Sequence, residues 1–131
     1  DEWSAVTQAL RQRMMRVTPS VFYHNAEHHP CLHQTLAVSG DGNVLPCPFL
    51  KDEILGRIGD PRVIDKIFES RAIDQYWWMS LSQIEGCKDC AFRFGCMDCR
   101  AVEKQLTGDL YGKVLCPYSV GRIEGGSVAV A

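Results

Sequence analysis

The sequence lacks any long apolar run, and no stretch approaches the roughly eighteen residues that a membrane-spanning helix needs. Its first residues, DEWSAV, lack the basic and then apolar pattern of a secretory signal. Charge of one sign is also scarce, because 14 Lys and Arg stand against 16 Asp and Glu, a formal net charge of −2. The chain therefore has no general attraction to nucleic acid or to anionic membranes. We expect a cytoplasmic protein.

Two motifs that would assign a chemistry directly are missing as well. Neither C-x2-C pair is followed by His, which excludes c-type haem attachment. The histidines do not form the H-E-x-x-H motif of zinc proteases. The first residue is Asp rather than Met, so we expect either a piece of a longer polypeptide or a processed chain.

A chain of 131 residues with 46% hydrophobic residues predicts one domain with a modest core. We predict a helix and linker over residues 1–30, a cysteine-bearing domain over residues 31–118 and a flexible tail over residues 119–131. Because small domains are marginally stable without a staple, the cysteines are the feature to explain.

Local signals predict an α+β fold, with a small β-hairpin, short helices and irregular loops. Apolar alternation on either side of the Asp41-Gly42 turn pair predicts the hairpin over His33–Cys47. Val21–Cys31 is expected as a polar surface loop or a source of histidine ligands, and Phe49–Gly59 as irregular. Apolar periodicity, N-cap and proline signals predict helices over Glu2–Val17, from Asp60 and Pro61 onward, over Arg71–Ser80, and over Arg100–Leu106 with Gly108 ending it.

The seven cysteines are too many and too regularly spaced to be packing residues. Four of them follow the pattern C-x2-C-x5-C-x2-C, and each C-x2-C pair can point both sulfurs at one metal centre. An odd number of cysteines, with no mark of secretion, argues against a disulfide framework. The predicted hairpin can also bring Cys31 and Cys47 together, although fifteen residues separate them. In chain order the seven are Cys31, Cys47, Cys87, Cys90, Cys96, Cys99 and Cys116.

Zinc and iron–sulfur clusters are the two alternatives for these thiols. One structural zinc needs four ligands and leaves three cysteines over, whereas two zinc sites need eight ligands and would have to recruit a histidine. Four cysteines instead complete one [4Fe–4S] site, and the other three can hold a second cluster. Lys88, Arg93 and Arg100 lie among these cysteines, where positive charge either raises a cluster's potential or is solvated at the surface.

The cysteine pattern resembles that of the SPASM domain, the C-terminal auxiliary-cluster module of radical SAM enzymes that modify peptides and proteins. The matching stretches are CLHQTLAVSGDGNVLPCP, with Cys31, Gly42 and Cys47, then CKDCAFRFGCMDCRA, and finally CPY with Cys116. One spacing departs from the family, since two residues rather than three separate Cys96 from Cys99.

The resemblance implies an interleaved set of ligands. Cys87, Cys90, Cys96 and Cys116 would hold one [4Fe–4S] cluster completely. Cys31, Cys47 and Cys99 would hold a second. The fourth position of that second cluster is left to a substrate thiol or to one of four nearby side chains, which are His24, Glu27, His28 and His29.

The resemblance also implies a role in maturing a ribosomally made peptide, through electron transfer, substrate positioning or both. The C-x3-C-x2-C motif that binds the SAM cluster is absent, so the chain is not expected to be catalytic alone. It would need a radical SAM core, in a separate protein or a missing domain. Its other expected partners are a precursor peptide and an external electron acceptor. The alternative is a ferredoxin-like electron carrier or a zinc-stapled interaction module.

Overall fold

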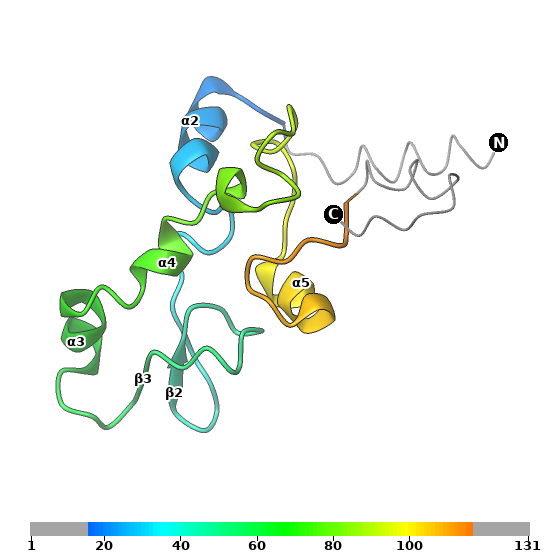
Figure 1. The fold of residues 1–131 in the computed structure, drawn as a ribbon. Helices are drawn as coiled ribbons and strands as arrows, with labels where there is room; N and C mark the ends of the chain where they lie inside the picture. Colours follow the sequence, from blue (N-terminus) through cyan, green and yellow to red (C-terminus); the bar gives the residue numbers. More distant parts are fainter. Residues whose placement is uncertain (1–15, 117–131) are drawn as a thin grey trace. The chain divides into compact units, whose positions relative to one another are not determined.

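The computed structural model describes residues 16–116 (Figure 1). The helix predicted over Glu2–Val17 lies outside these residues except for its last two positions, and the tail predicted over 119–131 lies wholly outside them. The described chain divides into two compact units, one of residues 16–26 and 81–116 and the other of residues 27–80. The fold is a small α+β one, as predicted, with short helices and short antiparallel strands.

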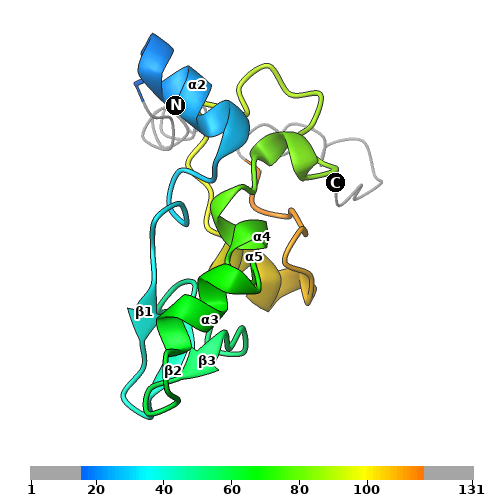
Figure 2. The same ribbon diagram turned by 90° about the vertical axis from the view of Figure 1, so that its left-hand side faces the viewer.

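The unit of residues 27–80 is built on a three-stranded antiparallel sheet in the order β1-β2-β3 (Figure 2). Strands β1 (Ala37–Val38) and β2 (Asn43–Leu45) form the predicted hairpin. Gly42 between them has φ 85°, a conformation that glycine adopts without strain. Strand β3 (Gly56–Arg57) pairs with β2 inside the segment expected to be irregular, so that expectation is wrong. Two residues, one of them glycine, carry no alternating pattern from which a strand could be predicted.

Two short helices follow the sheet. Helix α3 runs over Val63–Glu69 and begins after Arg62, whose φ of 56° is left-handed. The prediction that Asp60 and Pro61 start this helix is therefore wrong, because both lie in the preceding turn. Helix α4 covers only Asp74–Trp77, shorter than the predicted Arg71–Ser80. Arg71 has φ 58°, and a left-handed residue interrupts the right-handed helical path.

The core of this unit is formed by side chains from β2, from α3 and α4, and from the loops that join the elements. The Tyr76 hydroxyl donates a hydrogen bond to the Glu53 carboxylate, and Trp77 Nε1 donates to the Thr35 carbonyl at 3.0 Å. Both bonds join residues distant in sequence and satisfy polar groups at the edge of the core. The most deeply buried apolar side chains are those of Leu32, Val44, Leu45, Leu50, Ile67, Ile73, Tyr76 and Met79.

The other unit includes most of helix α2 (Pro19–Glu27), the 3₁₀ turn η1 (Leu81–Gln83) and helix α5 (Arg100–Thr107). Helix α2 corrects the surface loop predicted over Val21–Cys31. The residues Thr18-Pro19 are a helix start signal that could have been recognised in the sequence. In the structure the Thr18 hydroxyl accepts the Val21 N–H at 3.3 Å, and Pro19 occupies the first helical position. Helix α5 confirms its prediction, since Gly108 ends it with φ 77°.

Within residues 16–116, none of the helices combines the length and apolar character required to cross a membrane.

The close approach of β3 to α3 gives a prediction for Gly56. A Cβ there would lie 2.6 Å from Val63 Cγ2, so we expect Gly56→Ala to destabilise the metal-loaded protein by about 1–3 kcal/mol in anaerobic denaturant unfolding. Gly40→Ala is the matched control, because nothing lies within 4 Å of its Cβ position, and its cost should stay within about 0.5 kcal/mol. Equal effects at the two positions would contradict this packing.

Candidate metal centre

The cysteine segment folds into consecutive tight turns. The Cys87 N–H donates to the Ile84 carbonyl at 2.8 Å, the Cys90 N–H to the Cys87 carbonyl at 2.9 Å, and the Gly95 N–H to the Phe92 carbonyl at 3.0 Å. Ile84 is fully buried and anchors the first turn. The turn from Cys87 to Cys90 places the first C-x2-C pair on one short stretch of backbone, an arrangement that a shared metal centre can use.

Four of the thiols lie close enough to act on one another electrostatically. Burial raises the pKa of the Cys87 thiol to about 11, and Cys96 and Cys116 add to that shift. Burial likewise raises the pKa of Cys96, with further contributions from Cys116 and Cys90. The unit of residues 16–26 and 81–116 therefore gathers Cys87, Cys90, Cys96 and Cys116, the set expected for one cluster.

The chemistry of this donor set fits an iron–sulfur cluster. None of the seven cysteines, all within the described residues, forms a disulfide. Burial raises the pKa of Cys87 and Cys96 and so disfavours their anionic forms, and a cationic centre would compensate thiolates gathered at this place. Metal coordination supplies that compensation by holding the thiols deprotonated. Four thiolates are the usual ligands of a [4Fe–4S] cluster.

A buried ion network joins the segment that carries Cys116 to helix α5. The Arg100 guanidinium donates to both carboxylate oxygens of Asp98 at 2.5 Å, and both side chains are fully buried. The same guanidinium donates to the carbonyls of Leu110 at 3.1 Å and Gly112 at 2.7 Å. Arg100 thus ties the residues before Cys116 to the turn between Cys96 and Cys99.

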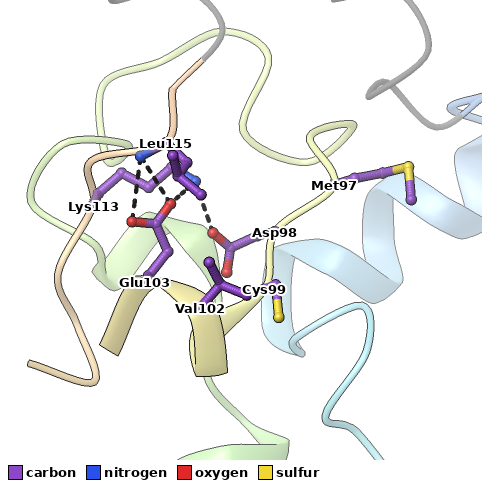
Figure 3. Close-up of a pocket in the computed structure, with 7 residues that line it drawn as sticks. All are labelled: Met97, Asp98, Cys99, Val102, Glu103, Lys113 and Leu115. Carbon is purple, nitrogen blue, oxygen red and sulfur yellow. Dashed lines mark hydrogen bonds and ion pairs between the residues drawn. The ribbon is translucent and has the colours of Figure 1, made fainter. Parts of the chain in front are cut away.

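Lys113 and Glu103 extend this network toward the site (Figure 3). The Lys113 ammonium donates to Asp98 at 2.9 Å and to Glu103 at 2.8 Å, while Glu103 also accepts the N–H groups of Val114 at 2.7 Å and Leu115 at 3.2 Å. Burial alone would lower the pKa of Lys113, but the two carboxylates outweigh burial and raise it. The ammonium therefore stays charged at neutral pH, where it partly offsets the raised pKa of nearby thiols.

Cys99 lies on the wall of a cavity beside this network. The cavity has a volume of about 310 Å³. The Cys99 thiol is exposed, and in Figure 3 its sulfur points away from the Lys113–Glu103 pair. The Cys99 carbonyl accepts the Glu103 N–H at 3.0 Å, which fixes its backbone to the start of α5. The lining residues are Met97, Asp98, Cys99, Val102, Glu103, Lys113 and Leu115.

Cys31 and Cys47 belong to the unit of residues 27–80. Cys47 is buried directly after β2, and its sulfur accepts the Phe49 N–H at 3.5 Å. Cys31 is exposed, and its own N–H donates to Nδ1 of His29 at 3.1 Å. The Leu32 N–H donates to the same nitrogen at 3.1 Å. A backbone N–H directed at sulfur, as on Cys47, is an interaction that stabilises a thiolate.

The four candidates for the remaining ligand position differ in their contacts. His29 is buried, and because its Nδ1 accepts two backbone N–H groups, it orients the turn at Cys31 rather than offering that nitrogen to a metal. Glu27 is exposed at the end of α2, and the His28 ring lies 4.7 Å from that of Trp78. His24 lies in the other unit, with Nδ1 at 3.0 Å from Asn25 Oδ1. Which of them completes the second ligand set stays a prediction.

Sequence reasoning missed the residues that support the site. Asp98, Glu103 and Lys113 did not stand out, because charged residues beside cysteines are ordinary surface residues in most sequences. The available signal was Asp98 within the CMDCR run, followed by alternating charges in the next helix and loop. His33 was also missed, and its ring packs 4.0 Å from that of His28.

The comparison with family models identifies the domain. Residues 30–91 match the SPASM model, described as an iron–sulfur cluster-binding domain. These residues, just under half of the chain, are similar to a SPASM domain. SPASM domains are auxiliary iron–sulfur cluster-binding domains that accompany radical SAM domains. Comparisons with curated proteins and with solved structures found no match.

The matched segment covers only part of the cysteine set. It contains Cys31, Cys47 and the first C-x2-C pair and ends at residue 91, before the other three cysteines. Cys96 and Cys116 are linked to the first pair by their electrostatic proximity to it, not by the family match. Their role within the SPASM domain of this chain rests on the chain's own geometry.

The ion network gives a prediction for Glu103. Removing its carboxylate by Glu103→Ala leaves Lys113 with one partner and two backbone N–H groups without an acceptor, so we expect a loss of about 3 kcal/mol or more in denaturant unfolding. Glu69→Ala is the control, because it breaks an exposed 2.8 Å ion pair with Arg62 and should cost less than about 1 kcal/mol. Equal losses of unfolding free energy for Glu103→Ala and Glu69→Ala would contradict a structural role of the network.

Proposed function

We propose that this SPASM domain holds two [4Fe–4S] clusters. Cys87, Cys90, Cys96 and Cys116 would ligate one of them, and their gathering within one compact unit is the observation that carries the proposal. The second set of Cys31, Cys47 and Cys99 is supported by the resemblance and by the N–H directed at the Cys47 sulfur. Three cysteines leave one position to His24, Glu27, His28, His29 or a substrate thiol.

We infer further that the domain serves radical SAM-dependent modification of a ribosomally made peptide. Bound clusters supply one-electron redox chemistry, so the domain can accept the electron released from a modified peptide or hold that peptide in place. This chain lacks the C-x3-C-x2-C motif, so the radical chemistry falls to a partner core that binds SAM. The association of SPASM domains with radical SAM domains supports this assignment. A precursor peptide and an external electron acceptor complete the set of partners.

In this role the protein's own residues have defined tasks. Arg100 and Lys113 hold the segment before Cys116 against α5, so this last ligand is presented to the other three. Buried Ile84 and the turn hydrogen bonds fix the backbone of the first C-x2-C pair. The apolar wall beside Cys99, with Val102 and Leu115, offers a surface for a peptide side chain.

Metal analysis after anaerobic reconstitution tests the cofactor. We expect roughly eight irons and eight sulfides per chain, and Cys90→Ala should lose about half of them because it removes a ligand of one cluster. Met97→Leu is the control, since it replaces a sulfur-bearing residue of the same segment that is outside the proposed ligand sets. One or two zinc ions in place of iron would contradict the proposal and support a zinc-stapled module.

A peptide assay tests the role in maturation. The chain would be produced with a C-x3-C-x2-C protein and a short precursor peptide encoded beside it, and the peptide mass measured. We expect Cys116→Ala to lower the yield of modified peptide by at least about tenfold, because one cluster loses a ligand. Glu69→Ala, which removes only an exposed ion pair with Arg62, should leave the yield unchanged. A peptide modified equally well without this chain would favour a general electron carrier.

A further inference from the structure

Three cationic side chains lie within residues 87–100, and the structure gives two of them other partners. Lys88 is 46% exposed and pairs with Glu85 at 2.8 Å, so water screens its charge. Arg100 is fully buried, but its guanidinium is taken up by the Asp98 carboxylate and by two backbone carbonyls. Neither cation is available to a group bound by the thiols.

Arg93 differs from both because one of its donors is buried without a partner. Its Nη1 donates to the Cys90 carbonyl at 2.7 Å, which directs the guanidinium toward the backbone of a proposed ligand. Its Nε is buried and has no hydrogen-bond acceptor within residues 16–116. An unmet donor on a permanent cation is costly to bury, so an acceptor is expected at this position in the working protein.

The guanidinium is held in place by its surroundings. Its central carbon lies 4.4 Å from the centre of the Phe94 ring, a cation–π contact. The Phe94 ring in turn packs edge-on against Phe22 of α2 at 5.1 Å, and the Phe94 carbonyl accepts the Asn25 side-chain amide at 2.7 Å. Because Asn25 is buried, this contact resists displacement. The acceptor must therefore come to Arg93, which lies in the loop between Cys90 and Cys96.

We propose that Arg93 donates its Nε–H to a sulfur of the iron–sulfur group held by Cys87, Cys90, Cys96 and Cys116. Arg93 would then act as a positioning residue that raises the reduction potential of this group, since a fixed positive charge and an N–H bond favour the more negative, reduced form. The inference rests on the proposed cluster. The guanidinium remains charged throughout the ordinary pH range, so the effect does not depend on a titration.

Potentiometric titration followed by electron paramagnetic resonance tests this role with the reconstituted chain. Arg93→Gln should lower one of the two midpoint potentials, by a shift equivalent to roughly a tenfold smaller equilibrium constant for reduction, and leave the other unchanged. Arg93→Lys keeps the charge but not the planar fork, and should give a smaller shift in the same direction. Lys88→Gln is the matched control, because it removes a screened charge beside Cys87. Equal shifts for Arg93→Gln and Lys88→Gln would overturn the proposal.

A second measurement starts from the unaltered chain and uses only a charge-preserving substitution for comparison. The unaltered chain is labelled with ¹⁵N-arginine, reconstituted and reduced, and pulsed electron paramagnetic resonance looks for coupling between the cluster and an arginine nitrogen. We expect a coupling in the unaltered chain and its loss in Arg93→Lys. If iron is bound without such a coupling, the role of Arg93 is overturned while the proposed function stands. If no iron is bound, the proposed function fails and this inference with it.

Discussion

The gathering of four cysteine thiols within one compact unit is the constraint on which the site depends. Cys87, Cys90, Cys96 and Cys116 come together there, and burial raises the pKa of Cys87 and Cys96, so the thiolate forms of these two are unfavourable without a metal. The gathering becomes favourable when a cationic centre is bound, because coordination holds all four sulfurs as thiolates. The match to an iron–sulfur cluster-binding family agrees with this chemistry.

A second electrostatic feature makes that gathering possible. Asp98, Arg100, Glu103 and Lys113 form a buried network of two anions and two cations, so it adds no net charge beside the cysteines. Buried ion pairs contribute little net stability, but they demand one geometry, because a displaced member leaves a charge without a partner. Here the demanded geometry fixes the segment that ends at Cys116. The network therefore specifies the position of the last ligand more than it strengthens the fold.

Much of this protein could be predicted from its sequence, wherever the signal was local. The cysteine spacing led to iron–sulfur chemistry and to the SPASM family, which the family model confirms. The Asp41-Gly42 pair predicted the hairpin, and Gly108 predicted the end of α5, because both need a backbone conformation that glycine provides. Helix α2 could also have been found, since Thr18 and Pro19 form a complete start signal. The ligand partition and the fourth ligand of the second set stay predictions.

The tertiary structure decided what depends on residues far apart in the chain. Strand β3 exists because β2 pairs with it, and Asp98 finds Lys113 across fifteen positions, so neither could be read from neighbouring residues. The same holds for the three cations within residues 87–100, which look equivalent in the sequence. Lys88 is solvated, Arg100 is fully paired and Arg93 keeps a buried donor without an acceptor within residues 16–116. Sequence determined which thiols and charges are present, whereas packing determined which of them can act together, because burial and hydrogen-bond geometry exist only in the folded chain.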